Sequence, residues 1–386
     1  MIPLFAFLAS LTACESNDLP IQHADSYRYI TFAARTQKMT TRADDRYESY
    51  DPVQHPQDMG VFGYYDFASH SFETTGTETG GKNNAIFDNI QVVYDTSTKT
   101  WSTKEEKRWD AYPDSNFDFF GYMPHSESAT LSKPSATEST YLLTIPFSMP
   151  TINGNPSPIL AQKDLRQAPI ICAKPEHKGS TTAGGSDATF ERVVTFLFDQ
   201  TLTGYNLNFQ LDQKMNAIRL FRIKGVKIYG KGLATGGNVS RSYTWSNNEW
   251  TAKAIQWSDL KKVNITEENA IKLAKNSETP FTPEYKEYMD IDDSKYHRWG
   301  TTFYAIADAS FVPTIAVTYD VILKDEKGKT VTRQDVTSTI ILGNKYFETL
   351  NPAQTAAIYN INILIQPRYL YVLADQDAYT GHLLIQ

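Results

Sequence analysis

The sequence lacks three features that mark common functional classes. It has only two cysteines, Cys14 and Cys172, no long block of like charge, and no extended apolar run after its first residues. Two cysteines exclude a disulfide framework and any metal site built on several thiolates. A formal net charge of −7 without a basic stripe disfavours nucleic-acid binding, because a surface that binds phosphates needs clustered Lys and Arg.

Motifs for catalysis and cofactor binding are incomplete. Gly76 to Asn83 nearly fits the phosphate-binding pattern GxxxxGK[ST], but Asn83 replaces the Ser or Thr that holds magnesium, and no helix pattern follows. The serine-hydrolase pattern Gly-x-Ser-x-Gly is absent. The seven histidines, among them His125 and His297, do not cluster at metal-ligand spacing. We therefore expect that the protein is not an enzyme, binds no cofactor and has no metal site built on clustered histidines.

A short acidic segment is the one place that suggests calcium. Asp290, Asp292 and Asp293 offer oxygen atoms of the type that calcium binds. They lack the glycine at the sixth position and the closing glutamate of an EF-hand loop. A solvated turn is the alternative interpretation of the same residues.

The first fourteen residues indicate export. An apolar run, Ile2 to Leu11, leads into Leu11-Thr12-Ala13-Cys14, and small residues before a cysteine are what a bacterial lipoprotein signal peptidase cuts. The run is too short to span a bilayer. We expect a signal peptide over residues 1–13, lipidation of Cys14, and a polar tether over 14–26 through which the lipid holds the domain at a membrane. The alternative is a buried N-terminal strand with a chance cysteine.

The remainder of the chain has the pattern of an all-β protein. Tyr, Phe, Thr, Val and Ile recur in short alternating runs bounded by Gly, Pro, Asn and Ser. The lone Cys172 lies in such a run and is expected to be a small core residue. Before residue 185 we expect strands at Tyr29 to Ala34, Val61 to Phe67, Ile90 to Tyr94, Phe117 to Tyr122 and Tyr141 to Pro146.

A Gly- and Ser-rich stretch, Lys174 to Ala188, divides the strand patterns into two groups. We place a domain boundary there, with an N-terminal β-sandwich over 27–185 and a C-terminal one over 186–386. In the second, Leu207, Phe209 and Leu211 alternate with polar residues, which predicts a strand with one wet face. Lys324 to Lys329 predicts a hairpin turn. Thr266 to Lys275 is the one expected helix, with Thr266 as N-cap.

Several segments follow one another in a recognisable order along the chain. They are Tyr29 to Phe32, Thr41 to Ala43, Gly60 to Tyr65, Trp101, Arg108-Trp109, Phe117 to Pro124, Val194 to Leu202, Leu350 to Pro352 and a last strand from Tyr369. Taken together in this order, they resemble the fimbrillin family, the lipoprotein precursors of Bacteroidetes-type pili. Gln200 stands where the family often has His.

The resemblance implies two tandem transthyretin-like β-sandwich domains that assemble by strand exchange. In the family, an arginine-specific protease cuts after the first strand, that strand leaves, and a strand from a neighbouring subunit fills the groove. The candidate cleavage sites here are Arg42, favoured by its match to the Thr-Arg-Ala motif, and Arg46 and Arg35. The alternative is that these are ordinary loop arginines.

The strand that would be donated is expected in the C-terminal segment, Tyr369 to Gln386. There Leu370, Val372 and Ala374 alternate with Tyr369, Tyr371 and Leu373, which predicts a strand. A last strand that stays in its own sandwich is the alternative.

The resemblance therefore implies a surface lipoprotein that is a pilus subunit or accessory subunit and supports cell adhesion. Its expected partners are other pilus subunits, an arginine-specific protease, the outer membrane through the lipid, and a host or bacterial surface glycan or protein. The alternative is a monomeric glycan-binding lipoprotein, in which Trp245, Trp250, Trp257 and Tyr243 stack on sugars. The same rings are suited to packing in a sandwich core.

Overall fold

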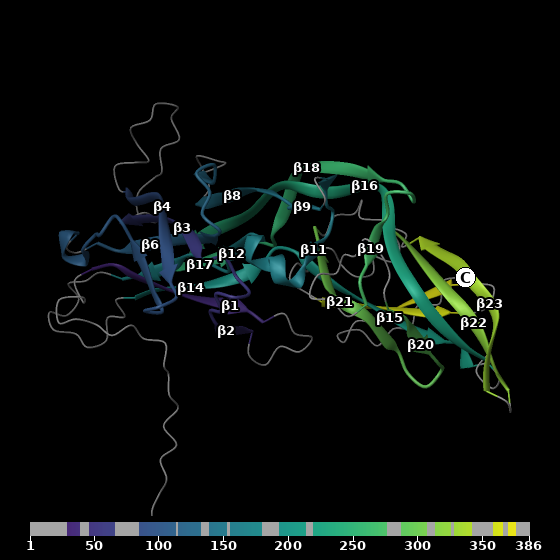
Figure 1. Ribbon diagram of the computed structural model, residues 1–386. Coiled ribbons are helices and arrows are strands. Elements are labelled where there is room, and N and C mark those ends of the chain that lie inside the picture. Colours follow the sequence, from purple (N-terminus) through teal and green to yellow (C-terminus); the bar gives the residue numbers. More distant parts are fainter. Residues whose placement is uncertain are drawn as a thin grey trace, which may run out of the picture.

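A computed structural model describes residues 29–38, 46–65, 85–112, 115–132, 139–152, 155–179, 193–213, 219–275, 287–306, 313–325, 328–341, 358–365 and 370–375. Within these ranges the chain is almost entirely β-strand, which confirms the expected all-β class (Figure 1). The helical turns described are of the 3-10 type: η2 (Trp109–Ala111) and η3 (Gln162–Gln167). No helix in the described part is long and apolar enough to cross a membrane.

Nine described strands form the N-terminal sheet, in the order β2-β1-β14-β12-β6-β3-β4-β5 with β13 also paired to β6. Four of the five strands expected before residue 185 lie in this sheet, as β1, β3, β4 and β6. Its strands are β1 (Thr31–Gln37), β2 (Tyr47–Ser49), β3 (Asp58–Tyr65), β4 (Ala85–Asp95), β5 (Thr100–Thr103), β6 (Phe117–Met123), β12 (Ile170–Cys172), β13 (Glu176–Lys178) and β14 (Val193–Gln200).

A second sheet, the spanning sheet, is organised around the 28-residue strand β16. Its path among the described strands is β23-β22-β16-β8-β7, and β17 to β20 also pair with β16. The bounds are β7 (Thr130–Ser132), β8 (Thr140–Ser148), β16 (Arg219–Ser246), β17 (Glu249–Ala252), β18 (Gln256–Ile265), β19 (Ile271–Leu273), β20 (Met289–Ile291), β22 (Thr314–Asp325) and β23 (Gly328–Ile341). The expected hairpin is confirmed by the pairing of Asp325 with Gly328, between which residues 326–327 lie outside the described part.

The C-terminal sheet has the order β11-β21-β15-β24-β25 in the described chain. Its strands are β11 (Leu160–Ala161), β15 (Thr203–Leu211), β21 (His297–Ala305), β24 (Ile358–Ile365) and β25 (Leu370–Asp375), and a separate small hairpin joins β9 (Thr151–Ile152) to β10 (Asn155–Pro156). β15 and β24 are parallel, with Asn206 opposite Asn360.

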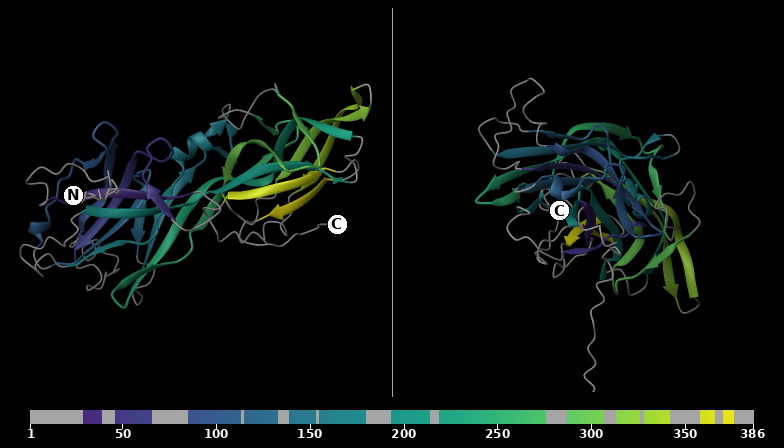
Figure 2. Two further views of the ribbon diagram at one scale, coloured as in Figure 1. Left: turned by 90° about the horizontal axis from the view of Figure 1, so that it is seen from below. Right: turned by 90° about the vertical axis from the view of Figure 1, so that its left-hand side faces the viewer.

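The spanning sheet contributes to two hydrophobic cores at opposite ends of the elongated molecule (Figure 2). The N-terminal core lies between the N-terminal sheet and the second half of β16, and includes Phe119, Phe196 and Tyr243. The C-terminal core lies between the C-terminal sheet and the first half of β16, and includes Phe209 and Phe221. A third cluster, which includes Leu165, Ala234 and Tyr304, packs residues from both halves together.

The division between the two cores does not coincide with a chain boundary at residue 185. β14, which follows that position, pairs with β1 and β12 of the N-terminal sheet. Gly236 to Thr244 of β16 pair with β8, and these strands supply the N-terminal core as well. The chain after residue 185 therefore contributes strands to both halves, and two independent tandem domains remain a prediction.

The expected helix over Thr266 to Lys275 is wrong. Residues 267–270 form a turn, with Ala270 N donating to Glu267 O, and Ile271 to Leu273 form β19. β19 pairs with Val226 to Ile228 of β16, and Leu273 is buried in the C-terminal core. Sheet pairing and burial thus outweigh a local capping signal, since helix propensity is a weak prior that tertiary context overrides.

The polar face of β15 is less exposed to solvent than its alternating sequence pattern predicts. Leu207, Phe209 and Leu211 are buried in the core as expected. On the other face, Asn206 is also buried, and its amide donates to Asn360 at 2.9 Å, while Asn208 donates to Asn362 at 2.8 Å. Cross-strand amide pairs therefore satisfy this face where water was expected.

Candidate functional site

Strand β1 lies between two neighbours of the N-terminal sheet. It is parallel to β14, from Thr31 opposite Val193 to Thr36 opposite Phe198, and antiparallel to β2, from Arg35 opposite Ser49 to Gln37 opposite Tyr47. Ile30, just before β1, donates its N–H to Lys107 O beyond β5. The first described strand is thus paired with β14 along most of its length, and with β2 over its last three residues.

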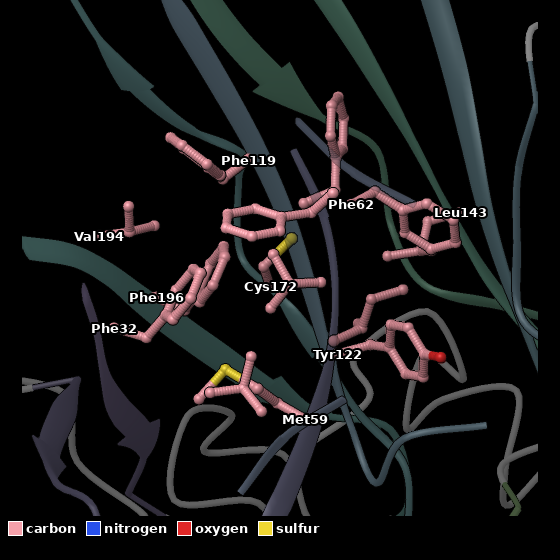
Figure 3. Packing of buried hydrophobic residues seen from close by; sticks show 14 of the residues in the cluster. Phe32, Met59, Phe62, Phe119, Tyr122, Leu143, Cys172, Val194 and Phe196 are labelled. Carbon is pink, nitrogen blue, oxygen red and sulfur yellow. The ribbon is translucent and has the colours of Figure 1, made fainter. Parts of the chain in front are cut away.

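The inward side chains of β1 complete the N-terminal core. Ile30, Phe32 and Ala34 are 5%, 3% and 8% exposed. The Phe32 ring stacks on the Phe196 ring with centroids 6.4 Å apart (Figure 3). Its centroid also lies 5.7 Å from that of the Phe87 ring.

A glycine makes room for this packing. A Cβ on Gly121 of β6 would lie 2.9 Å from the Phe196 ring, too close for any larger residue without a shift. The absence of a side chain at Gly121 therefore lets Phe196 lie flat beneath Phe32.

Without β1, the same structure would present an apolar groove. The rings of Phe87 and Phe196 would lose the side chain that covers them, and β14 would lose its backbone pairing with residues Thr31 to Thr36 of β1. An exposed edge with unpaired backbone groups beside an apolar trough is a template for another strand. This is the geometry that strand addition requires.

The three candidate cleavage arginines have different surroundings. Arg35 lies within β1 rather than in a loop, and its Nη2 donates to Tyr47 O at 3.1 Å. Arg46 directly precedes β2, and its carbonyl accepts from Lys38 N at 2.9 Å. Arg42 lies outside the described residues.

Arg46 belongs to an ionic cluster that the sequence did not reveal. Its Nη2 lies 3.2 Å from both carboxylate oxygens of Asp199 on β14. Tyr47 Oη donates to Asp199 Oδ1 at 2.7 Å, and Arg241 Nη1 on β16 donates to Oδ2 at 2.7 Å. Burial, together with the hydrogen bond to Asp199, raises the pKa of Tyr47, so this phenol stays protonated as the donor.

Cys172 lies beside this cluster in the core. It is fully buried, as expected, and its Sγ lies 3.2 Å from Tyr243 Oη. Burial raises the pKa of the Cys172 thiol, which keeps it in the unreactive neutral form. The carbonyl of Cys172 accepts from both Tyr243 and Arg241, at 2.7 and 3.3 Å.

The candidate donor residues lie in β25, at one end of the C-terminal sheet. In the register with β24, Leu370 lies opposite Ile365, Val372 opposite Ile363, and Ala374 opposite Ile361. Within the single chain, the segment therefore has a partner strand of its own.

The four aromatic residues considered for sugar binding do not form one exposed platform. Tyr243 and Trp250 are 0% and 3% exposed and belong to the N-terminal core. Trp257 is partly buried and donates its Nε1 to Thr201 O at 3.2 Å. Trp245 is also partly buried, with its ring 4.7 Å from the His177 imidazole.

Beneath Trp245 lies a second buried carboxylate that the sequence did not reveal. Asp118 on β6 has a fully buried side chain, and its Oδ1 accepts from Trp250 Nε1 at 2.7 Å. His177 Nδ1 lies 2.7 Å from the same oxygen. The available signal was an aspartate within an otherwise apolar strand, as for Asp199, because buried charges in proteins are paired.

The acidic segment near residue 290 is committed to other contacts. Asp290 accepts from Arg222 Nε and Nη2, at 2.7 and 3.2 Å. Asp292 accepts from Ser294 N at 3.0 Å, and its bonds from Ser294 lower its pKa to about 2. No group of three or more His, Cys, Asp or Glu suited to a metal occurs in the described part of the chain.

Some of the other residues singled out in the sequence lie in the described part of the chain, and others lie outside it. His125 Nε2 lies 3.1 Å from Asn89 O, and His297 Nε2 lies 3.4 Å from Asp292 Oδ1. Cys14, the first 28 residues and the glycine-rich loop at 76–83 lie outside the described residues, so the lipidation site stays a prediction.

No protein-family model and no curated protein sequence matches the chain. Among solved structures, a fimbrial protein from Bacteroides vulgatus aligns with a TM-score of 0.50 and 15% identity, over 90% of this chain and 98% of that one. A fimbrial assembly protein from Parabacteroides distasonis aligns over 93% of this chain and 99% of that one, with 10% identity. Its TM-score of 0.39 is too low to support a conclusion. The first likeness shows a shared fold across nearly the whole chain.

Proposed function

We propose that this chain is a non-enzymatic cell-surface protein of the fimbrillin type, a pilus subunit or accessory subunit that supports adhesion. In this proposal Cys14 carries the lipid that holds the precursor at the outer membrane, and subunits join by donor-strand exchange. The observation that carries the proposal is the position of β1, which is the first described strand and covers the Phe87 and Phe196 rings. The shared fold with a fimbrial protein is consistent with it.

The energetics of β1 suit a strand that is exchanged rather than simply lost. Burying a large apolar side chain such as Phe32 is worth about 1.5–3 kcal/mol, so an empty groove is unfavourable. A replacement strand would recover both this burial and the hydrogen bonds to β14. Cleavage after Arg42, Arg46 or Arg35 supplies the irreversible step. A cut after Arg42 or Arg46 frees all of β1, whereas a cut after Arg35 frees the strand only up to that residue.

The segment at 370–374 is the proposed donor. Leu370, Val372 and Ala374 have the same two-residue spacing as Ile30, Phe32 and Ala34, and both series end in alanine. To act in trans, the segment would exchange its pairing with β24 for pairing with β14 of a neighbouring subunit.

The test is to express the chain from Glu15 onward and treat it with an arginine-specific protease. Mass spectrometry identifies the cleavage site, and an unheated denaturing gel detects strand-exchanged oligomers. The proposal predicts loss of a fragment ending at one of the three arginines, and a ladder of oligomers that disappears on heating.

The matched control is Arg42→Lys, which keeps the charge and removes the favoured site for an arginine-specific enzyme. Wild-type protein that stays uncut, or that is cut and remains monomeric, would contradict the polymerising role. A tethered glycan binder would then be tested by quenching of tryptophan fluorescence with sugars. No described contact of the four aromatic residues favours that alternative over core packing.

A further inference from the structure

Three donors from two parts of the chain converge on Asp199. Arg46 and Tyr47 precede or begin β2, and Arg241 lies on β16 of the opposite sheet. Each is within 3.2 Å of a carboxylate oxygen, and the Asp199 side chain is only 4% exposed. Charge-assisted hydrogen bonds are stronger than neutral ones, so several of them together hold a buried carboxylate in one position.

The carboxylate has further contacts that involve neither β1 nor β2. Arg241 is 11% exposed and also donates to two backbone carbonyls, Cys172 O on β12 and Lys253 O after β17. Asp199 itself lies on β14, which pairs with β12 at Ile171. Asp199 therefore has contacts with β12 and β16 that involve neither β1 nor β2, although β14 also pairs with β1 up to Phe198.

β2, in contrast, depends on β1 for its described backbone pairing, which covers Arg35 to Gln37. If β1 leaves, the side-chain bonds of Arg46 and Tyr47 to Asp199 still connect the start of β2 to β14. Tyr50, just after β2, adds ring contacts to Tyr94 and Trp101 with centroids 4.8 and 4.9 Å apart. Residues 46–50 thus have attachments that do not pass through β1.

The same contacts oppose cleavage at Arg46. An arginine-specific protease must take the guanidinium into its own pocket and bind the flanking backbone in extended form. Here the guanidinium is paired with Asp199, and the Arg46 carbonyl accepts from Lys38 N. Cleavage requires both contacts to open, and its rate follows the population of the open state.

We infer that Asp199 is a positioning residue that anchors residues 46–50 and protects the Arg46 bond, so that the chain is cut upstream of Arg46 and β1 leaves without β2. This inference rests on the proposed strand exchange. Asp199 would thereby determine which residue becomes the N-terminus of the cleaved chain.

The experiment compares cleavage rates in the full chain with and without the carboxylate. Wild type, Asp199→Asn and Tyr47→Phe are digested under native conditions with an arginine-specific protease, and intact masses give the rate of each cut. We expect slow cleavage after Arg46 in wild type. Asp199→Asn should accelerate that cut by about three- to tenfold, because it weakens the bonds from both Arg46 and Tyr47, while the 57% exposure of the Arg46 side chain limits the strength of its ion pair.

The matched control is Asp290→Asn, which removes a carboxylate paired with an arginine in the other half of the molecule. It should leave the Arg46 rate unchanged. If Asp199→Asn loses its β circular-dichroism spectrum, Tyr47→Phe decides the question. It keeps both ion pairs, and it should still accelerate the Arg46 cut several-fold. Equal Arg46 rates in wild type and in every folded variant would overturn the inference.

A second readout separates this inference from the strand-exchange proposal. After cleavage at Arg42, hydrogen exchange of residues 46–50 should stay slow in wild type and become fast in Asp199→Asn. If no oligomers form, strand exchange is contradicted, and the rates of cleavage after Arg46 still test the role of Asp199. If oligomers form but the rate of cleavage after Arg46 does not depend on Asp199, only the role of Asp199 is contradicted.

Discussion

The indole Nε1 of Trp250 donates to Oδ1 of Asp118 at 2.7 Å, and this bond joins β17 of the spanning sheet to β6 of the N-terminal sheet. The Asp118 side chain is fully buried, and its Oδ2 has no hydrogen-bond partner among the described residues. Two groups, Trp250 and His177, therefore compensate a carboxylate that burial would otherwise make costly.

Trp250→Phe should destabilise the protein by about 1–3 kcal/mol, because it keeps an aromatic ring and removes one of the two donors to a buried carboxylate. Urea unfolding, followed by circular dichroism, measures the change. Trp245→Phe is the control, since Trp245 is only partly buried, and it should cost less. Equal losses in the two variants would mean that ring packing, and not the bond to Asp118, determines the effect.

Phe32→Ala should reduce the free energy of unfolding by about 3–5 kcal/mol, because it empties a ring site between Phe87 and Phe196 in the core. Hydrogen exchange should rise first in residues 31–37. On the same strand, Arg35→Lys changes an exposed side chain and should stay within about 0.5 kcal/mol. A loss of less than 1 kcal/mol in Phe32→Ala would show that β1 contributes little to the core.

The alternating pattern predicted several strands near their observed positions. β6 begins at the expected Phe117, and β8 covers the expected Tyr141 to Pro146. These segments combine β-branched and aromatic residues with nearby turn residues, so local propensity and burial agree. Arg35 illustrates the limit, because β1 continues past the apolar run to Gln37 through pairing with β2.

What the sequence could not reveal depends on distant contacts. β16 runs through a glycine-rich stretch, Gly230 to Gly237, that locally resembles a break between strands. It continues because β18 pairs with it from Gly230 to Ser240, and β8 joins on the other side from Gly236 onward. Likewise, Asp199 and Arg241 are 42 positions apart, and no local pattern indicates that they meet.

Acid should destabilise the protein through His55. This side chain is 5% exposed, and burial lowers its pKa from 6.5 to about 4. The unfolded chain therefore binds a proton near pH 6.5 that the folded protein does not bind until about pH 4. Stability from this group is complete above pH 6.5, and about 3 kcal/mol should be lost as the pH falls to about 4.

The measurement is urea unfolding at a series of pH values for wild type and His55→Gln, with NMR titration of the His55 ring. Glutamine cannot take up the proton, so the variant should lose less stability over this range. A wild-type slope that persists in His55→Gln would assign the acid sensitivity to another group.

Gly236→Ala should destabilise both halves of the molecule together. A Cβ at Gly236 would lie 2.6 Å from the carbonyl oxygen of Phe147 on β8, and a backbone atom cannot move aside without shifting the strand. We expect a cost of about 1–3 kcal/mol, as for other overpacked sites. Because β16 supplies Phe221 to one core and Tyr243 to the other, the effect should reach both.

Hydrogen exchange at increasing denaturant, followed in β6 and in β24, measures the two halves separately. Both should lose protection at the same denaturant concentration, and Gly236→Ala should lower that concentration equally for each. Gly179→Ala is the control, because a Cβ there meets nothing within 4 Å. If β24 opens well before β6 in wild type, β16 does not couple the two cores. The continuous strand would then be a shared scaffold for two separately stable units.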